Sequence, residues 1–481
     1  MPLDHDRVGG WKEDTIPIER ADGYKREVAT KVEDGKEKAV LVGVQLPRAD
    51  VELSVSLDEL EQLAAGAEVS VVGRVTQKLD EPHPKHYLGK GKLEDLKALC
   101  AESGATIVIF DDELRPNVQK ELERELELRV IDRTLLILDI FARRAHTHEG
   151  RVQVELAQYK YLLPRLVGKG TELSRLGGGI GTRGPGESKL EFDRRRMRER
   201  ISKLEKEIET IRLQRQVHRG SRRRASLPLI ALIGYTNVGK SMLLNQLTGS
   251  DVGVANQLFA TLDPTTRKLA LPSGQEVLVS DTVGFIAKLP TTLVAAFRAT
   301  LEELSDADLL LHVVDITDLQ VDYATRVVHK LVSDLGLQEK PVLTVLNKAD
   351  RLPPGAAVAE DGVDPLKGMA PEAMGLEPVP DTVLVSASRG WGMESLKLKI
   401  EEMLNASTPA LEVLVPYSAS ELVDLFRRSG VVESEDYTEE GTLLKGRLPA
   451  RFLGRFEEYR VQKAAVGRRR RQTIVTSCNS H

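Results

Sequence analysis

The stretch Gly234-Tyr235-Thr236-Asn237-Val238-Gly239-Lys240-Ser241 fits the phosphate-binding pattern G-x-x-x-x-G-K-[ST]. The apolar run 227–233 before it is expected to be a buried strand, and a helix is expected to follow and to end at Gly249. The glycines let the backbone approach a polyphosphate, Lys240 neutralises phosphate oxygens, and Ser241 offers a hydroxyl to Mg²⁺. Glycine turns without a ligand also fit this pattern, so the rest of the chain must decide.

A second motif, Asp281-Thr282-Val283-Gly284, follows the expected strand 276–280. Asp281 is thereby placed to hold a water on Mg²⁺, and Gly284 can offer its N–H to a γ-phosphate. We therefore expect Lys240 and Gly284 to stabilise the phosphate that is transferred.

Two further motifs point to guanine. Asn347-Lys348-Ala349-Asp350 follows the apolar run 341–346, and the Asp350 carboxylate can accept hydrogen bonds from N1 and N2 of guanine. Adenine lacks that pair of donors, and a buried acceptor left unpaired costs about 1–3 kcal/mol, so the motif favours GTP over ATP. Ser386-Ala387-Ser388 is expected to place backbone N–H groups on guanine O6. All four motifs follow predicted strands, where open α/β sheets bind ligands, so the sequence predicts a GTP site.

The segment Phe259-Ala260-Thr261-Leu262-Asp263-Pro264-Thr265-Thr266 lies between the first helix and the next strand of this unit. One of its threonines is expected to close over Mg²⁺ when GTP is bound. Spacing alone does not distinguish Thr261, Thr265 and Thr266, and any of them can instead cap a turn.

Phe285 follows Gly284 at the position where Ras-like enzymes carry the glutamine that orients the attacking water. A phenyl ring can neither orient nor deprotonate water, so the catalytic residue stays unknown and intrinsic hydrolysis is expected to be slow. Our hypothesis is that a partner or a rearranged loop completes the site. The alternative is that Phe285 is an ordinary core aromatic and that another residue positions the water.

Composition indicates an intracellular protein of two to four units. The chain has 481 residues, of which 41% are hydrophobic and 29% charged. It contains no apolar run of 18 residues and no apolar leader, so neither a transmembrane helix nor a signal segment is expected. Cys100 and Cys478 are the only cysteines, which excludes a disulfide framework and a Cys-rich zinc site and favours the reducing cytoplasm. The pairs His83/His86 and His146/His148 lack metal spacing and are expected to be solvated loop residues.

The net charge of −5 conceals basic blocks. They lie at 194–196, 198, 200, 222–224 and 468–471. Such blocks suit contact with an RNA backbone, but glutamates interleave with those near 200, so a solvated helix face explains that block equally well.

The remaining segments predict a multidomain α/β protein around a P-loop GTPase domain with a mostly parallel sheet. Alternating strands (38–44, 68–75, 106–110, 128–132) and helices (57–65, 91–102, 115–125) indicate an N-terminal α/β domain. The expected units are an N-terminal extension 1–36, an α/β domain with a glycine-rich loop 37–186, a helical arm 187–224, a GTPase domain 225–408 with an insertion 353–381, an α+β domain 409–465, and a basic disordered tail 466–481.

The helical arm carries apolar residues at three- and four-residue spacing, as in an amphipathic helix of a hairpin or coiled coil. In the α+β domain a helix over 420–428 is expected among strand-like runs at 411–416, 431–437 and 442–448. The loop 88–92 could hold a phosphate, although its spacing favours a plain helix start.

The glycine-rich stretch 173–187, with Tyr159-Lys160-Tyr161-Leu162-Leu163-Pro164-Arg165-Leu166 before it and Asp193-Arg194-Arg195 after it, resembles the signature that precedes the G domain of the HflX GTPases. The segments 234–237 and 258–263 resemble loops of that family too. The resemblance covers about residues 38–460. Met242 departs from the family's usual Thr, a change that should leave Mg²⁺ binding intact.

The resemblance implies a cytoplasmic GTPase that binds the large (50S) ribosomal subunit and its RNA, and that splits or rescues ribosomes under stress. It implies that Ser241 and Thr261 hold Mg²⁺ and that residues 259–263 belong to the nucleotide pocket. It also implies an apolar residue at position 285, where this chain has Phe285. Some members are also expected to use ATP through the N-terminal domain. The sequence of this chain gives no independent support for ATP binding there. A monomer is expected, and peripheral membrane association stays open. The residues expected to bind GTP are Gly234, Tyr235, Thr236, Asn237, Val238, Gly239, Lys240, Ser241, Phe259, Ala260, Thr261, Leu262, Asp263, Asp281, Thr282, Val283, Gly284, Asn347, Lys348, Ala349, Asp350, Ser386, Ala387 and Ser388.

Two other functions are compatible with the same motifs. One is a nucleotide-regulated switch that binds a non-ribosomal protein or membrane complex. The other is ATP-dependent RNA remodelling, although the sequence lacks helicase motifs.

Overall fold

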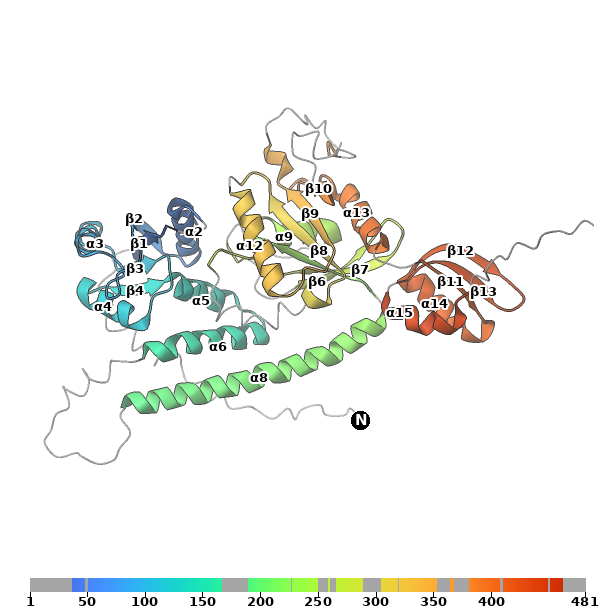
Figure 1. The fold of residues 1–481 in the computed structure, drawn as a ribbon, viewed down its shortest axis with the longest axis horizontal. Coiled ribbons are helices and arrows are strands. Elements are labelled where there is room, and N and C mark those ends of the chain that lie inside the picture. Colours follow the sequence, from blue (N-terminus) through green and yellow to red (C-terminus); the bar gives the residue numbers. More distant parts are fainter. Residues whose placement is uncertain are drawn as a thin grey trace, which may run out of the picture.

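A computed structural model shows the chain as a row of domains joined by a long helix (Figure 1). The structure describes residues 37–47, 51–166, 189–225, 227–249, 258–259, 265–288, 304–318, 320–352, 364–366, 380–406, 410–448 and 450–461. The N-terminal extension, the glycine-rich loop, the basic tail, Thr261 and most of the predicted insertion lie outside these residues. Within them the strands form three sheets.

The first sheet belongs to the predicted N-terminal α/β domain and is parallel throughout; its strand order, which was not predicted, is β2-β1-β3-β4. Its strands are β1 (Lys38–Gln45), β2 (Ser70–Lys78), β3 (Ile107–Phe110) and β4 (Arg129–Asp132). The helices are α2 (Leu53–Gly66), α3 (Lys90–Ser103), α4 (Pro116–Leu126) and α5 (Arg133–Arg144). Successive side chains of β1 face opposite sides of the sheet. Ala39 and Leu41 therefore pack under α2 and α5, while Val40 and Val42 pack under α3 and α4.

Two helices of this region were not predicted. Helix α5 begins directly after β4, where the Asp132 carboxylate accepts a hydrogen bond from the Leu135 amide at 3.0 Å. Its central residues 135–141 are apolar except for Asp139, and most of them are buried between the sheet and the GTPase domain. An apolar run this short does not distinguish a helix from a buried strand. Helix α6 (His148–Arg165) begins at the Thr147 cap and contains Pro164 in its last turn.

The predicted arm is helix α8 (Lys189–Ala225), which packs against α6 as a helical hairpin (Figure 1). Leu204 is fully buried between the two helices, beside Val152 and Leu156 of α6. A bidentate pair joins Arg200 to Glu155 at 2.7 and 2.8 Å. Within the described residues no helix is long and apolar enough to span a bilayer.

The second sheet has the order β10-β9-β8-β5-β7-β6, and only β6 runs antiparallel to its neighbour. The strands are β5 (Leu229–Gly234), β6 (Thr265–Ala270), β7 (Glu276–Asp281), β8 (Leu309–Asp315), β9 (Val342–Asn347) and β10 (Thr382–Leu384). The helices are α9 (Lys240–Thr248), α12 (Val321–Asp334) and α13 (Met393–Ala406). All four predicted motifs follow the carboxyl ends of parallel strands and so meet at one edge of the sheet.

The third sheet is the predicted α+β unit, with antiparallel order β11-β13-β12. It contains β11 (Ala410–Val415), α14 (Ser420–Ser429), β12 (Val431–Tyr437), β13 (Thr442–Arg447) and the unpredicted α15 (Ala450–Phe456). Phe426 of α14 and Phe456 of α15 make an edge-to-face contact in its core, with ring centroids 5.6 Å apart.

The hairpin depends on Leu204, so Leu204→Ala should lower its stability by about 2–5 kcal/mol. Hydrogen exchange of α6 and α8 amides measures this loss locally. Leu213→Ala is the matched control on the same helix because the Leu213 side chain is 54% exposed. Equal exchange in the two variants would contradict the packing described here.

Candidate functional site

The P-loop is shaped by two glycines that no other residue can replace. Gly239 has a φ of +96°, and a Cβ there would lie 2.5 Å from the Asn347 side-chain nitrogen. Gly234 has a φ of +153°, and its Cβ would lie 2.4 Å from the Val313 carbonyl oxygen. Both positions are strained for L side chains and closed by neighbours. The loop therefore turns tightly from β5 into α9, as the motif predicts.

Lys240 lies folded into this loop and is almost fully buried. Its Nζ donates to the carbonyl oxygens of Gly234 at 3.1 Å and Tyr235 at 2.7 Å. Burial lowers the lysine pKa to about 8, although the nearby Asp281 carboxylate opposes this shift. A phosphate at the loop would add negative charge and favour the ammonium form.

A hydroxyl and a carboxylate meet beside Lys240. The Ser241 Oγ donates to Asp281 Oδ2 at 2.6 Å. Two oxygen donors of this kind suit Mg²⁺, which prefers hard oxygen ligands. The predicted third participant, Thr261, lies outside the described residues, as do Ala260, Leu262 and Asp263.

The Asp281–Gly284 motif packs directly on the P-loop. A Cβ on Gly284 would lie 3.0 Å from Thr236 Cα and 3.1 Å from Lys240 Nζ, so only glycine fits without displacement. The Thr282 hydroxyl donates to the Leu232 carbonyl and is buried, which makes its side chain a structural one. Val283 is buried in the apolar cluster shared with the N-terminal domain.

Phe285 pairs with the P-loop through its backbone. Its amide donates to Gly234 O at 3.1 Å, and its carbonyl accepts from the Thr236 amide at 2.8 Å. Its side chain is 2% exposed and packs among Ile233, Leu304 and other core residues. The ring is thus a core aromatic and does not face the loop where phosphate is expected. Which group positions the attacking water, from a partner or from this chain, stays a prediction.

The guanine motifs hold one another in place. Asn347 donates to the Val238 carbonyl at 2.8 Å and accepts from the Ala387 amide at 3.0 Å. Asp350 Oδ1 accepts from the Ser386 hydroxyl at 2.6 Å, and that hydroxyl lies 3.1 Å from the Ser388 hydroxyl. The amides of Ser386 and Ala387, expected to reach guanine O6, donate within the protein instead.

Asp315, which the sequence analysis missed, completes this edge. It ends β8 and pairs with Lys348 at 2.6 Å, while Lys348 also donates to the Asn237 carbonyl at 3.0 Å. Burial alone would raise the pKa of Asp315, but hydrogen bonds from Lys348 and Thr317 outweigh it and lower the pKa. An acidic residue at the end of an apolar strand was the signal that could have found it.

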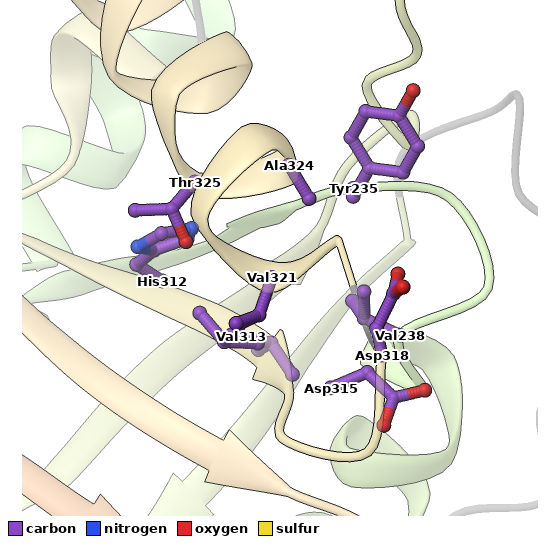
Figure 2. Close-up of a pocket in the computed structure, with 10 residues that line it drawn as sticks. Tyr235, Val238, His312, Val313, Asp315, Asp318, Val321, Ala324 and Thr325 are labelled. Atoms are coloured by element: carbon purple, nitrogen blue, oxygen red, sulfur yellow. The ribbon is translucent and has the colours of Figure 1, made fainter. Parts of the chain in front are cut away.

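A small pocket lies between β8 and α12, on the side of the P-loop that carries Tyr235 and Val238 (Figure 2). His312 lies in its wall. Burial, with smaller contributions from His329 and Lys240, lowers the His312 pKa to about 4, so its imidazole is neutral. The pocket is lined by Tyr235, Val238, His312, Val313, Val314, Asp315, Asp318, Val321, Ala324 and Thr325.

The Phe259 ring is buried against the N-terminal domain. It is 2% exposed and stacks edge-to-face on Phe141 of α5, with centroids 4.6 Å apart. Arg144 of α5 donates to the adjacent Leu258 carbonyl at 2.6 Å. The start of the Thr-rich segment is therefore anchored to the N-terminal domain, and a contact of Phe259 with the nucleotide stays a prediction.

Tyr235 is a second contact between the two domains. Its hydroxyl donates to Glu59 of α2 and accepts from the Ala287 amide at 2.8 Å. Burial, with Glu59 beside it, raises the tyrosine pKa, so the hydroxyl stays protonated. One P-loop side chain thus joins the segment after Gly284 to the N-terminal domain.

Buried charges surround that contact. Arg133 is 1% exposed and pairs with Asp111 and Glu59, both at 2.6 Å. It also lies 3.4 Å from the Ala287 carbonyl, and Lys288 pairs with Asp111. Nearby opposite charges raise the Arg133 pKa and lower that of Asp111, although desolvation opposes both shifts. These groups are therefore charged and paired across the interface.

Of the remaining predicted features, the structure confirms some and contradicts others. Residues 90–92 form the first turn of α3, and the Gly89 amide donates to Gln77, so the loop is the plain helix start that its spacing favoured. His146 is exposed as expected. His148 is exposed too, but it begins helix α6 and its Nε2 lies 3.1 Å from Glu207, so it is not a loop residue. His86 is not a solvated loop residue: it is 8% exposed, because the loop folds back onto α4.

Three family models match successive parts of the chain. Models described as GTP-binding GTPase N-terminal, GTP-binding GTPase middle region and 50S ribosome-binding GTPase match residues 54–142, 144–222 and 229–348. GTPase HflX of Caldanaerobacter subterraneus subsp. tengcongensis is 45% identical over 424 residues, covering 88% of this chain and 94% of that protein. This chain belongs to the HflX family of GTPases.

A second HflX relative gives a similar match. GTPase HflX of Escherichia coli is 41% identical over 418 residues, which cover 86% of this chain and 94% of that protein. The crystal structure of a GTP-binding protein from Sulfolobus solfataricus with GDP is 26% identical and covers 76% and 98% of the two chains, with a TM-score of 0.38. As an HflX-family GTPase with a P-loop domain, the chain binds and hydrolyses GTP.

Phe285 is tested by changing it to the glutamine of Ras-like enzymes. Phe285→Gln buries an amide in an apolar core, so it should cost about 3–5 kcal/mol in unfolding free energy without accelerating GTP turnover. Phe285→Leu is the control, with an expected loss near 1.5 kcal/mol. Denaturant unfolding and single-turnover hydrolysis measure both. A stable Phe285→Gln protein with faster turnover would show that the side chain reaches the phosphate site.

Proposed function

We propose that this GTPase binds the large ribosomal subunit in the cytoplasm, hydrolyses GTP there, and splits or rescues stalled or idle ribosomes under stress. The main observation behind this proposal is that the Phe285 side chain is buried in the core. In Ras-like enzymes the residue at this position orients the attacking water. A group supplied by a partner would then complete the site. The printed description of the matching G-domain model, 50S ribosome-binding GTPase, supports the ribosome as that partner.

Helix α8 supplies a surface for ribosomal RNA. Arg195, Arg196 and Arg198 are exposed on it, and Arg195 pairs with Glu199 at 3.8 Å and lies over the Phe192 ring. Arg200 differs because its guanidinium is committed to Glu155. Exposed arginines on a projecting helix can contact phosphates at little structural cost.

Within the site, we propose that Ser241 and Thr261 hold Mg²⁺, which would neutralise charge on the phosphates. Asp281 would orient this centre, Lys240 and Gly284 would contact the transferred phosphate, and Asp350 would read guanine. The domain boundaries given above from the sequence are part of the same proposal.

The experiment compares GTP turnover by the full chain alone, with 50S subunits and with 30S subunits. We expect 50S subunits to raise turnover on the order of 100-fold, the scale that one positioned catalytic group contributes, and 30S subunits to leave it unchanged. The stimulation should fall as salt rises, because phosphate contacts are lost.

A paired variant locates the contact. Arg195→Glu with Arg198→Glu should weaken 50S binding and spare intrinsic turnover. Arg428→Glu with Arg455→Glu reverses the same charge on exposed arginines of the C-terminal domain and is the control. Failure to bind 50S in both the GTP-analogue and GDP states would favour a switch for another protein or for a membrane.

A further inference from the structure

The loop between β2 and α3 carries a buried histidine that the GTPase site does not use. His83 and Tyr87 pair through both backbone amides, at 3.2 and 2.9 Å, and so close a tight turn around His86. The Tyr87 hydroxyl fastens the turn to Asp112 at 2.8 Å. His86 is 8% exposed as a result, although its neighbours in the loop are accessible.

Neither ring nitrogen of His86 has a hydrogen-bond partner among the described residues. Buried polar groups are normally bonded, so this imidazole lacks the interaction that would account for its burial. His83 stacks on it with parallel rings 5.5 Å apart, which occupies the face of the ring and leaves the nitrogens at its edge.

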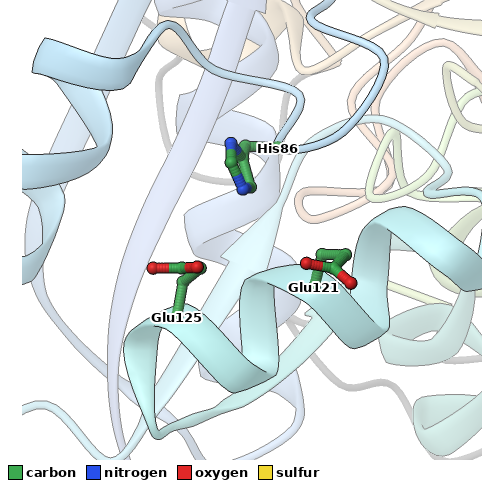
Figure 3. A group of neighbouring side chains, drawn as sticks. All are labelled: His86, Glu121 and Glu125. Atoms are coloured by element: carbon green, nitrogen blue, oxygen red, sulfur yellow. The ribbon is translucent and has the colours of Figure 1, made fainter.

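Two carboxylates of α4 lie beside those nitrogens. Glu121 and Glu125 are four residues apart and therefore share one face of the helix. Figure 3 shows the His86 imidazole above both side chains. One ligand atom from each of the three residues lies within 4.8 Å of the other two.

Cations already contact these glutamates, but not His86. Arg124 and Lys85 approach Glu121 at the same oxygen, Oε2, at 2.5 and 3.4 Å. Lys97 approaches Oε2 of Glu125 at 3.2 Å, and Arg124 lies 3.6 Å from its other oxygen. Ordinary ion pairs thus account for part of the carboxylate cluster. They leave the other oxygen of Glu121 and both imidazole nitrogens to be explained.

We propose that His86, Glu121 and Glu125 bind a divalent transition-metal ion, with Zn²⁺ as its reference member. One imidazole nitrogen and two carboxylate oxygens are ligands that Zn²⁺ accepts in a tetrahedral site, with water as the fourth. Mg²⁺ and Ca²⁺ prefer sites made of oxygen alone. Burial, with Lys85 nearby, lowers the His86 pKa, so the imidazole is neutral and its lone pair is available.

The ion would connect the β2–α3 loop to α4. Because Leu88 and Gly89 lead directly from this loop into α3, the connection would fix the start of that helix. The site is far in sequence from the P-loop and shares no residue with it. Its expected effect is therefore on the stability of the N-terminal domain and not on GTP turnover.

The test is a calorimetric titration of ZnCl₂ into the metal-stripped full chain, kept in saturating MgGDP so that the GTPase site is occupied. We expect one site that His86→Ala, Glu121→Gln and Glu125→Gln each weaken roughly tenfold or more. Zn²⁺ should also raise the unfolding temperature of the parent chain but not of these variants.

His146→Ala and Glu102→Gln are the matched controls, since both residues are exposed and lie outside the cluster. The two glutamine variants change partly exposed side chains and should fold even if His86→Ala does not. Zn²⁺ binding of equal affinity in parent, cluster variants and controls would overturn the proposal, and so would the absence of Zn²⁺ binding by the parent chain.

Discussion

The backbone pairing of Phe285 with Gly234 and Thr236 is the constraint on which the rest of the site depends. It fixes the chain after Gly284 against the P-loop, so that Gly284 touches Thr236 and Lys240. It also turns the Phe285 ring into the core. Backbone bonds in a buried site are strong and directional, so this pairing sets the geometry whatever side chain stands at 285.

The same pairing brings Ala287 to the Tyr235 hydroxyl, and through it to Glu59 of the N-terminal domain. Arg133 and Asp111 extend the contact to Lys288. Breaking one member of a buried ion pair typically costs about 3–5 kcal/mol, because the other charge is left without a partner. The loop that is to hold GTP, the segment that follows Gly284 and the N-terminal domain therefore form one connected structure. Under the proposed function, a partner that binds the N-terminal domain would act on the nucleotide site through these contacts.

Much of this could be predicted from the sequence because the signals are local. A P-loop between a strand and a helix, and acidic or amide residues at strand ends, depend on short segments with fixed spacing. The parallel N-terminal sheet followed from strands and helices that alternate along the chain. Helix α5 was missed because its apolar core, buried between the sheet and the GTPase domain, is a short run that does not distinguish a helix from a strand.

Long-range packing decided the other differences. Phe259 belongs to a loop motif in sequence, but Phe141, more than a hundred residues earlier, captures its ring. His86 looked like a solvated loop residue because its burial depends on α4, which the loop sequence does not contain. The Ala387 amide was assigned to guanine, but Asn347 accepts its hydrogen bond. These contacts join residues that are far apart in the chain, so no local sequence pattern predicts them.

The most direct test of this connection is hydrogen exchange in Tyr235→Phe, which removes one hydroxyl and leaves the Ala287 amide without its acceptor. Loss of a hydrogen bond worth about 1 kcal/mol predicts roughly fivefold faster exchange of peptides that contain Ala287, together with faster exchange in α2 around Glu59. Peptides from β12 and β13 should be unchanged. Unaltered exchange at both Ala287 and α2 would contradict the claim that the Tyr235 hydroxyl joins the P-loop to the N-terminal domain.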